Sequence, residues 1–298
     1  MKPAISVIIP TYNRLVGLKY TLESLVKQEL DKACYEVLVC DDGSAEDTYS
    51  IVKEYENDLN IYYEYQEDKG FRAAAARNMG IKKATGDVCL FIDNGIILHK
   101  DVLNEHMRIH NESSRPCAIV GYVYGFDVFE SNEDAIKKIV ENNTVENAIQ
   151  ILGEIGVGDV REKFYKEFSD DIDHLPAPFV LFWTCHVSMS RKSLIDIGMF
   201  DESFTTWGGE DIDIGLALQK YGAKFVLARN AMSIHYPHKK EFDFANESDK
   251  ADRHVDEKKE YLYRKYPTRA VYLWTQTNDD VELNKILMDE AATINHPQ

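Results

Sequence analysis

The segment 207–213 joins a tryptophan, two glycines and a run of carboxylates, and an apolar pattern of helical spacing follows it. Glycine lets a backbone turn sharply and come close to a ligand. Carboxylates in the first turn of a helix are stabilised by the helix dipole. The pattern therefore predicts a helix over 210–221 with Glu210 and Asp211 at its start. A capped amphipathic helix without further function is the alternative, although the exposed Trp-Gly-Gly sequence costs stability that a cap alone does not require.

Polar residues also follow short apolar runs nearer the N-terminus, and several of them could bind a nucleotide. Asp42 could accept a hydrogen bond from a base N–H or a ribose hydroxyl, and Tyr12 could stack on a flat ring. Arg72 or Arg77 could contact a phosphate. Each has a structural alternative, which is an Asp-Gly turn for Asp42, a core aromatic for Tyr12 and a surface charge for either arginine.

Two further residues could hold a divalent cation. Asp93 follows an almost wholly apolar run, where a lone carboxylate is well situated to coordinate a metal ion. His235 follows another predicted strand and lies in an apolar context, and histidine is a frequent metal ligand. A strand-ending turn and a structural histidine are the alternatives.

The first part of the chain alternates predicted strands with predicted helices. This alternation predicts a parallel sheet covered on both faces, and ligands of such sheets bind beyond the carboxyl ends of the strands. The polar residues described above fall at those ends. The expected strands are 5–9, 36–40, 61–65 and 88–92, and the expected helices are 14–28, a segment that ends at Tyr55, 73–84 and 101–110.

The second part of the chain is less regular. Residues 127–175 are rich in acidic residues and poor in strand signals, which predicts a helical insertion. The charged tail from residue 241 onward is predicted to be mostly helical. The other expected elements are helices near 132–153 and 160–168, a strand over 179–189, a short helix over 192–197 and a strand over 224–228.

The composition is that of a globular protein with a strong acidic balance. Of the 298 residues 44% are hydrophobic and 29% are charged, and the formal net charge is −17. This charge argues against nucleic-acid binding and against electrostatic docking on anionic lipid. No apolar run is long enough to span a bilayer, and no signal sequence is recognisable. Five scattered cysteines indicate reduced thiols. We therefore expect a soluble cytoplasmic protein, with peripheral membrane attachment left open.

Taken together, the motifs resemble a known enzyme family. The segments 5–13 (ISVIIPTYN), 39–44 (VCDDGS) and 76–80 (ARNMG) are similar to the nucleotide-binding half of family 2 glycosyltransferases of the GT-A fold. Residues 182–235 resemble the galactosyltransferase-type C-terminal segment that β-1,4-galactosyltransferases, polypeptide N-acetylgalactosaminyltransferases and bacterial chondroitin polymerases share. The matches keep the family's order over roughly residues 4–238, so the set is specific.

The resemblance implies an α/β fold with a Rossmann-like, mixed and mostly parallel sheet flanked by helices. It divides one GT-A domain into a nucleotide-sugar-binding half and an acceptor-binding, catalytic half. The implied boundaries are 1–125 for the first half, 126–178 for the helical insertion, 179–240 for the second half and 241–298 for a C-terminal helical extension.

The resemblance also implies roles for individual residues. Tyr12 would stack on the uracil of a UDP-sugar, Asp42 would hydrogen-bond it, and Arg77 would reach the nucleotide or its diphosphate. Asp211 would be the general base, with Glu210 beside it. The implied nucleotide-binding set is Pro10, Thr11, Tyr12, Asn13, Arg14, Asp42, Arg72, Arg77, Asp93 and Asn94, and the implied donor-sugar and acceptor set is Trp183, Trp207, Gly208, Gly209 and Glu210.

For the metal, the resemblance implies that Asp93 begins an Asp-x-Asp motif and that His235 completes the site. The chain departs from the family pattern at Gly95, where a second carboxylate is usual. Diphosphate oxygens, an Asn94 carbonyl and water could still complete an octahedral shell. We therefore expect dependence on a divalent metal, with Mn2+ ahead of Mg2+.

These features predict an inverting transferase that moves a hexose or an N-acetylhexosamine from a UDP-sugar to a glycan, peptide or small-molecule acceptor. Retaining members of the resembled family carry Asn where this chain has Asp211, which favours inversion. A non-catalytic or weakened nucleotide-sugar-binding module is the alternative, because Gly95 removes a ligand. A sugar nucleotidyltransferase fits less well, because no glycine-rich phosphate loop follows the first strand. A homodimer formed through the C-terminal extension is left open.

Overall fold

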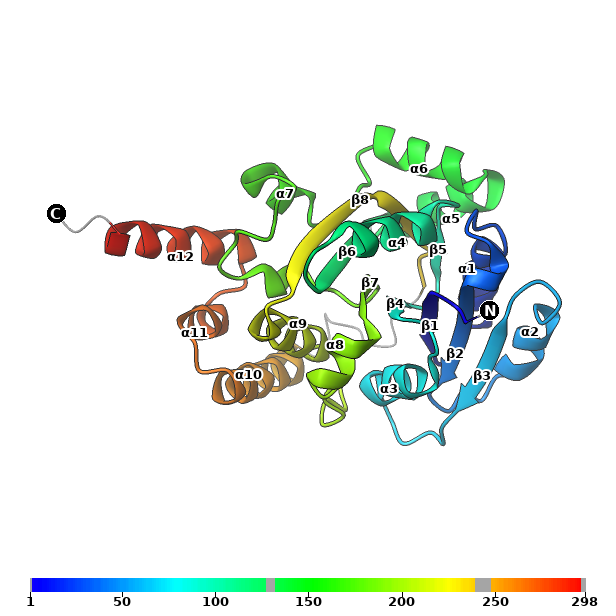
Figure 1. Cartoon of the computed structure of the whole chain (residues 1–298), viewed down its shortest axis with the longest axis horizontal. Coiled ribbons are helices and arrows are strands. Elements are labelled where there is room, and N and C mark those ends of the chain that lie inside the picture. The colour runs from blue at the N-terminus through cyan, green and yellow to red at the C-terminus, as the bar shows by residue number, and fades with distance from the viewer. Residues whose placement is uncertain (1, 127–131, 239–247, 296–298) are drawn as a thin grey trace.

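One mixed sheet of eight strands organises the chain, and helices cover both of its faces (Figure 1). The computed structural model describes residues 2–126, 132–238 and 248–295, with the backbone alone for 248–256 and 294–295. The strands are β1 Ile5–Thr11, β2 Tyr35–Asp41, β3 Ile61–Tyr65, β4 Val88–Ile92, β5 Ile96–Leu98, β6 Cys117–Tyr124, β7 His186–Ser190 and β8 Lys224–His235. Along the sheet they follow the order β3-β2-β1-β4-β7-β6-β8-β5.

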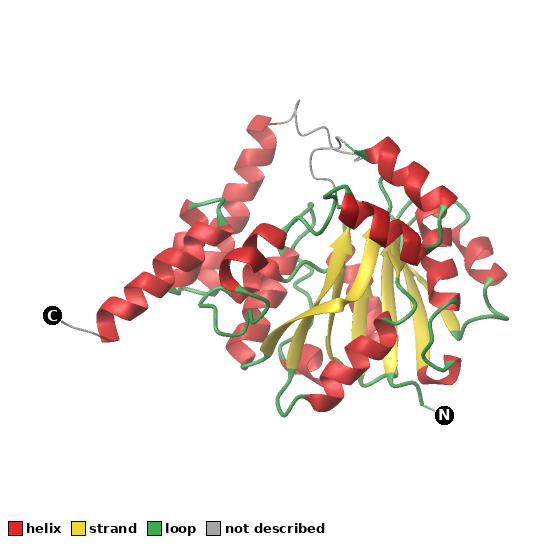
Figure 2. Cartoon of the chain, turned by 90° about the horizontal axis from the view of Figure 1, so that it is seen from above, coloured by secondary structure: helices red, strands yellow, loops and turns green. Residues whose placement is uncertain are grey.

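Helices cover both faces of the twisted sheet (Figure 2), and the helices of the tail lie to one side of it (Figure 1). In chain order the α-helices are α1 Leu15–Val26, α2 Thr48–Glu54, α3 Ala73–Lys83, α4 Val102–Glu112, α5 Glu133–Asn142, α6 Val145–Glu154, α7 Glu162–Phe168, α8 Arg191–Asp196, α9 Glu210–Tyr221, and α10 Ser248–Lys265, α11 Arg269–Gln276 and α12 Asp280–Asn295 of the tail. Two short 3-10 helices, η1 Lys32–Cys34 and η2 Pro178–Leu181, complete the set.

Strands β1 to β4 form the parallel half that the sequence predicts. Their side chains alternate between the two layers, because successive residues of a strand point to opposite faces. Val7 and Ile9 pack in the core beneath α1, α2 and α4. Ile8 packs in the other core, beneath α3 and α9. Burial on both faces explains why these strands read as continuous apolar runs.

The second half mixes strand directions. Strand β7 is antiparallel to both β4 and β6, while β6 and β8 are parallel to each other. The short β5 closes the edge by pairing antiparallel with the end of β8, where Ile96 lies opposite His235. The predicted mixed, mostly parallel α/β sheet flanked by helices is confirmed.

Several element boundaries differ from the prediction. The strand expected over 179–189 is wrong in its first part, because Pro178 begins the 3-10 helix η2 and only 186–190 enters the sheet. Strands β5 and β6 were not predicted, and β8 continues past residue 228 to His235. An apolar run alone does not distinguish a buried strand from a buried turn of helix.

The insertion is helical, as predicted, but two helices, α5 and α6, take the place of the single helix expected near 132–153. Helix α5 ends before Thr144, whose side chain accepts a hydrogen bond from the N–H of Asn147 and begins α6. Residues of α5 and α6 pack with Ile97 and Ile234 at the β5–β8 edge. The domain boundaries given above stay a prediction.

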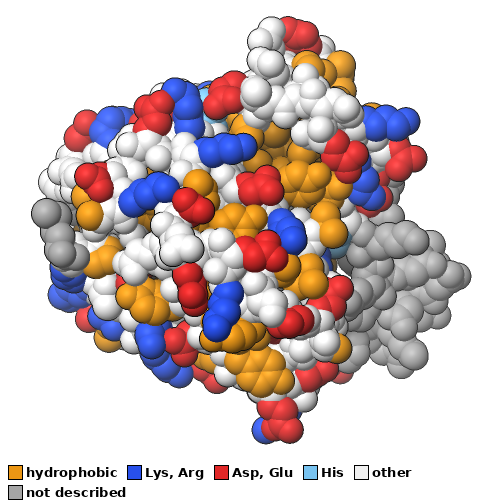
Figure 3. All heavy atoms as spheres, turned by 90° about the vertical axis from the view of Figure 1, so that its right-hand side faces the viewer, with side chains coloured by type: hydrophobic (Ala, Val, Ile, Leu, Met, Phe, Trp, Pro, Cys, Tyr) orange, Lys and Arg blue, Asp and Glu red, His pale blue; other side chains and the backbone are white. Residues whose placement is uncertain are grey.

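Both signs of charge occur on the surface of the protein. On the face in Figure 3, acidic and basic side chains are interspersed among apolar ones. The tail is helical, as expected, with α10, α11 and α12 joined by short connections. Among the described residues no helix is both long and apolar enough to cross a bilayer.

A row of buried polar side chains crosses the centre of the second half. His106 contacts Ser188 at 2.8 Å and His186 at 3.1 Å, and His186 contacts Ser233 at 2.9 Å. His110 also contacts the Ser188 hydroxyl, at 2.9 Å. Burial lowers the pKa of His106, lowers that of His110 to about 4 and lowers that of His186 to about 3. The row is therefore uncharged at neutral pH.

This row predicts a loss of stability in mild acid. The pKa values of these histidines lie below the unfolded value of about 6.5, so the unfolded chain binds more protons as the pH falls below 6.5. Each histidine should lower the free energy of unfolding by about 1 kcal/mol between pH 7.5 and pH 5.5. Urea unfolding of the wild type and of His110→Gln at both pH values measures how much His110 contributes to this loss of stability. An equal pH-dependent loss in both proteins would show that His110 protonates normally in the folded state.

Candidate active site

The candidate site lies where strands β1, β2 and β4 end. Thr11 and Asp41 are the last residues of β1 and β2, and Asp93 follows β4 directly. The N–H of Asp42 donates to the Thr11 carbonyl at 2.9 Å, which joins the first two loops. Parallel strands bring their carboxyl ends to one edge of a sheet, so these polar residues meet there.

The two neighbouring aspartates after β2 have different surroundings. Asp41 closes its own turn by accepting from the N–H groups of Gly43 and Ser44, at 3.1 and 2.8 Å. Asp42 accepts from the side-chain amide of Gln66 at 2.6 Å and from the N–H of Arg72 at 2.7 Å. Burial raises the pKa of the Asp42 carboxyl, and these donors oppose that rise. Asp42 is therefore held beside the start of α3, where its carboxylate is a candidate to accept a hydrogen bond from the N–H of a nucleobase.

The loop after β1 is held by its own polar side chains. The Asn13 side-chain oxygen accepts from the N–H groups of Ala45 and Glu46, at 2.8 and 3.3 Å, and Asn13 itself has a left-handed φ of 47°. The Tyr12 hydroxyl donates to Asp68 at 3.0 Å. These contacts fix the loop that carries Tyr12 against the loops after β2 and β3.

Asn94 and Gly95 are turned into the protein. The Asn94 side chain is 3% exposed, and its amide donates to the Thr11 hydroxyl and to the Arg14 carbonyl. Gly95 has a φ of +100°, a conformation that L-residues rarely adopt. A carboxylate at position 95 would therefore be strained here, which gives a backbone reason for the departure from the family pattern.

Arg77 joins the two halves of the chain. Its guanidinium donates to Asp93 at 3.1 Å and to Glu210 at 3.2 Å, and it lies over the Phe200 ring. The Arg77 residue is 4% exposed and Glu210 is 5% exposed. Burial alone would lower the pKa of Arg77, but the charges of Asp93, Asp211 and Glu210 outweigh burial and raise it. The guanidinium therefore stays charged and holds the end of β4 against the start of α9.

Asp211 faces the same cluster from the first turn of α9. The Thr184 hydroxyl donates a short hydrogen bond to one of its carboxylate oxygens. Burial and the neighbouring charge of Glu210 raise the pKa of Asp211 to about 7, against the attraction of Arg77. A carboxyl group with this pKa can take or give a proton near neutrality. Sequence reasoning missed the contribution of Thr184, although it directly follows Trp183.

The aromatic and glycine residues of the second half border the cluster. The Trp183 indole N–H donates to the Val180 carbonyl at 2.9 Å, and its ring lies 5.7 Å from Phe126. Trp207 is 62% exposed. Gly208 and Gly209 have φ values of 81° and 98°, so the chain turns through the left-handed region just before α9.

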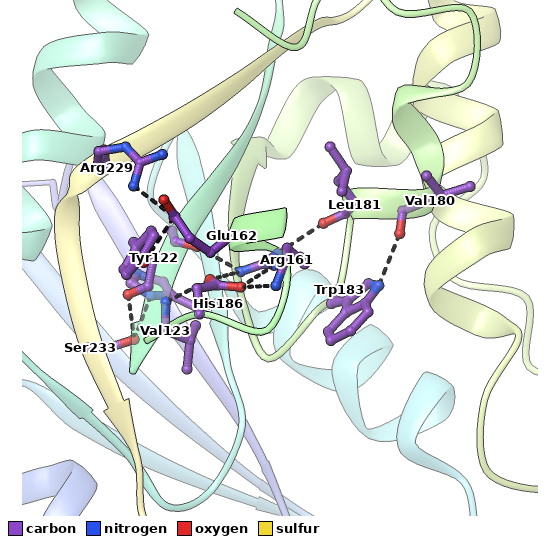
Figure 4. Close-up of polar contacts among 12 residues, drawn as sticks. Tyr122, Val123, Arg161, Glu162, Val180, Leu181, Trp183, His186, Arg229 and Ser233 are labelled. Atoms are coloured by element: carbon purple, nitrogen blue, oxygen red, sulfur yellow. Dashed lines mark hydrogen bonds and ion pairs between the residues drawn. The ribbon is translucent and has the colours of Figure 1, made fainter. Parts of the chain in front are cut away.

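The sequence analysis missed a buried ion pair near Trp183, whose arginine, Arg161, is labelled in Figure 4. Arg161 donates to both carboxylate oxygens of Asp159, at 2.9 and 2.6 Å. It also donates to the carbonyls of Gly121 and Leu181, both at 3.0 Å, and it lies over the Trp183 ring. Arg161 therefore ties the insertion to β6 and to the segment that carries Trp183. No local sequence pattern predicts such a pair.

The predicted metal ligands Asp93 and His235 are not part of a three-ligand cluster among the described residues. His235 pairs across the sheet with Ile96, three residues beyond Asp93, and its ring lies 5.3 Å from that of His238. Burial and the charges of Arg14 and His235 lower the pKa of His238 to about 3, while the Asp93 charge opposes this. Across residues 2–126, 132–238 and 248–295, no group of three His, Cys, Asp or Glu side chains could hold a metal ion.

The structure thus brings the separate motifs to one region. Arg72, which directly precedes α3, donates its N–H to Asp42. Helix α3 carries Arg77 to Asp93, and Arg77 also reaches Glu210 at the start of α9. Asp93 also acts electrostatically on Asp211 and on His238. The roles given to Pro10, Arg14 and the other members of the predicted sets stay predictions.

Comparison with known proteins identifies the family and the fold. Residues 6–195 match the family described as glycosyl transferase family 2, and residues 171–241 match the one described as N-terminal domain of galactosyltransferase. The chain belongs to glycosyl transferase family 2, and it is a glycosyltransferase of the GT-A fold.

The relatives differ in length and in the names they carry. Validoxylamine A glucosyltransferase of Streptomyces hygroscopicus subsp. jinggangensis (strain 5008) is 32% identical over 98% of this chain and 69% of its own length. Hyaluronan synthase of Pasteurella multocida is 35% identical over 88% of this chain, which corresponds to 28% of the synthase. The chain therefore spans about two thirds of the former and under a third of the latter.

Two solved structures share the fold. Staphylococcus aureus TarS 1-349 in complex with UDP-GlcNAc has a TM-score of 0.52 at 21% identity, and the match covers 82% of this chain and 60% of that one. The mannosyltransferase PcManGT from Pyrobaculum calidifontis, in complex with GDP-Man and Mn2+, has a TM-score of 0.59 at 16% identity and covers 100% and 77%.

The position of Arg77 predicts a pH-dependent loss of stability when the cation is removed. Arg77→Met leaves Asp93 and Glu210 without their buried counter-charge, which should lower the free energy of unfolding by about 3 kcal/mol at pH 7.5. The loss should shrink at pH 5.5, because the freed carboxyls can protonate there. Urea unfolding at both pH values measures it.

The matched control is Arg269→Ala, which breaks the exposed ion pair with Glu290 and should cost less than about 1 kcal/mol at either pH. A loss for Arg77→Met that is equal at the two pH values would mean that packing, and not charge, accounts for it.

Proposed function

We propose that the chain is an inverting glycosyltransferase that moves a hexose or an N-acetylhexosamine from a UDP-sugar to a hydroxyl group of its acceptor. The observation that carries the proposal is the environment of Asp211. This carboxylate begins a helix, accepts from Thr184 and belongs to a charged cluster that Arg77 connects to the nucleotide edge. Membership of family 2 supports the transferase chemistry.

Asp211 acts as the general base in this proposal. A sugar hydroxyl is a weak nucleophile at neutral pH, so a carboxylate must accept its proton as the oxygen attacks the anomeric carbon. A pKa near neutrality suits this task, and the hydrogen bond from Thr184 fixes the orientation of the carboxylate. Direct attack opposite to the leaving UDP inverts the anomeric centre.

The first half of the chain binds the nucleotide. Tyr12 offers a ring on which uracil can stack, and Asp42 offers a carboxylate to the base N–H. Because the Arg77 charge is shared by Asp93 and Glu210 and is buried, Arg77 acts on the nucleotide side through Asp93. The UDP-GlcNAc complex of TarS supports a UDP-sugar as donor.

Asp93 and His235 would hold a divalent ion at this edge. The Asp93 side chain is 37% exposed and engages Arg77 through one oxygen, and the half-buried His235 lies opposite Ile96 in the β5–β8 pair. These two ligands leave most of an octahedral shell to diphosphate oxygens and water, and an imidazole ligand favours Mn2+ over Mg2+. When bound, the ion would neutralise charge on the departing diphosphate.

One observation favours a second candidate function. The left-handed backbone at Gly95 leaves a single carboxylate in the metal motif, which is consistent with a nucleotide-sugar-binding module of weak or no activity. Release of UDP from UDP-glucose, UDP-GlcNAc and UDP-GalNAc, with a panel of glycan, peptide and small-molecule acceptors, separates the two. Binding without release in every combination would favour the module.

Asp211→Asn tests the base directly. The amide keeps the shape of the side chain but cannot accept a proton, so we expect turnover to fall by about 10²–10⁴-fold. UDP binding, measured by calorimetry, should change less than about twofold. In the wild type the rate should fall as the pH drops below the pKa of Asp211, because the base becomes protonated. Substantial turnover by Asp211→Asn would exclude this role.

His235→Ala tests the metal. We expect the Mn2+ concentration for half-maximal UDP binding to rise at least about tenfold, since losing one of two protein ligands weakens the site. Calorimetric titration of UDP at several Mn2+ concentrations measures this value and does not require turnover. His174→Ala removes an exposed histidine and should leave it unchanged. Equal Mn2+ dependence in wild type and His235→Ala would remove His235 from the metal site.

A further inference from the structure

One face of α10 lies against α9 and against the loop that precedes it. Lys258, Tyr261, Leu262 and Lys265 recur at helical spacing, so their side chains share one face of the helix. Leu262 is fully buried in the same core as Ile214 of α9. The helix begins after residue 241, so neither of the family matches covers it.

Lys258 holds the middle of the loop. Its ammonium donates to the carbonyl of Thr206 at 3.2 Å and to the carbonyl of Trp207 by a short hydrogen bond. Lys258 is half-buried, and burial lowers its pKa while the charge of Glu210 opposes this. Its aliphatic chain lies close to Gly209, where a Cβ would come within 3.3 Å of the Lys258 Cδ. The same side chain thus contacts both the backbone of Trp207 and the turn before α9.

The other residues of this face hold the two ends of the loop. The Tyr261 hydroxyl donates to Asp201 at 2.6 Å, and Lys265 donates to the same carboxylate at 2.7 Å. Lys265 also pairs with Asp213 at 2.8 Å, two residues beyond Asp211 on α9. The face of α10 therefore contacts the segment 201–213 at its start, middle and end.

The segment between these anchors has a backbone that needs external support. Gly208 and Gly209 both have positive φ, and glycine has more conformational freedom to lose than any other residue. Trp207 meanwhile exposes 62% of its surface. Hydrogen bonds from Lys258 to consecutive carbonyls reduce that freedom and fix the direction in which Trp207 points.

We propose that α10 sets the position of the segment 201–213 and that Lys258 is the positioning residue for Trp207, which the family resemblance assigns to the donor sugar or the acceptor. The part of this inference that concerns the donor sugar or the acceptor rests on the proposed function. The part that concerns loop order does not. Lys258 itself contacts backbone carbonyls and is not assigned a step in the reaction.

Lys258→Met tests the inference in the full chain, because methionine retains most of the aliphatic chain and removes the ammonium. We expect amide hydrogen exchange over residues 204–210 to accelerate at least tenfold, with exchange of β1, β2 and β4 unchanged. UDP affinity by calorimetry should stay within twofold, and the rate of UDP release from UDP-glucose should fall at least fivefold. The matched control is Lys285→Met on the same tail, which removes the exposed ion pair between Lys285 and Glu167 of α7 and should leave all three readouts unchanged.

The readouts separate this inference from the function on which it partly rests. If the wild type releases no UDP from any UDP-sugar, the proposed function fails, while the exchange measurement still reports on loop order. Unchanged exchange over 204–210 in Lys258→Met would overturn the inference, whatever the rate. Exchange that accelerates throughout the chain would also overturn it, because that pattern reports general destabilisation and not the release of one loop.

Discussion

The buried guanidinium of Arg77 is the interaction on which the candidate site depends. It binds Asp93 at the end of β4 and Glu210 at the start of α9, which are 117 residues apart in the chain. Glu210 would lose its buried counter-charge without it, and the guanidinium needs both carboxylates in return. This mutual requirement holds the end of β4 and the start of α9 together.

Asp211 is then oriented from three directions. Arg77 holds the preceding residue, Thr184 donates to Asp211 itself, and Lys265 of α10 binds Asp213. The segment that carries Thr184 is held in turn by the Asp159–Arg161 pair, because Arg161 binds the carbonyls of Leu181 and of Gly121 in β6. Elements from the insertion and from the tail therefore serve the same helix start.

The departure at Gly95 has a local structural cause with a functional consequence. The turn after β4 passes through the left-handed region at that position, and the Asn94 side chain is turned inward to bind Thr11 and Arg14. The motif keeps Asp93 at the edge and gives up its second carboxylate. His235, which the pairing of β5 with β8 places opposite Ile96, is the second protein ligand in the proposed metal site.

The sequence by itself determined the parallel half of the sheet, the helix over 210–221 and the identities of the chemical groups, because buried strands, helix starts and family motifs leave local patterns. It did not determine the break at Pro178, strands β5 and β6, or the contacts of Arg77, Arg161 and Lys258. Only the tertiary structure decided those, since a hydrogen bond between residues far apart in the chain has no local signature. Likewise, an apolar run reads the same whether it becomes a strand or a 3-10 turn.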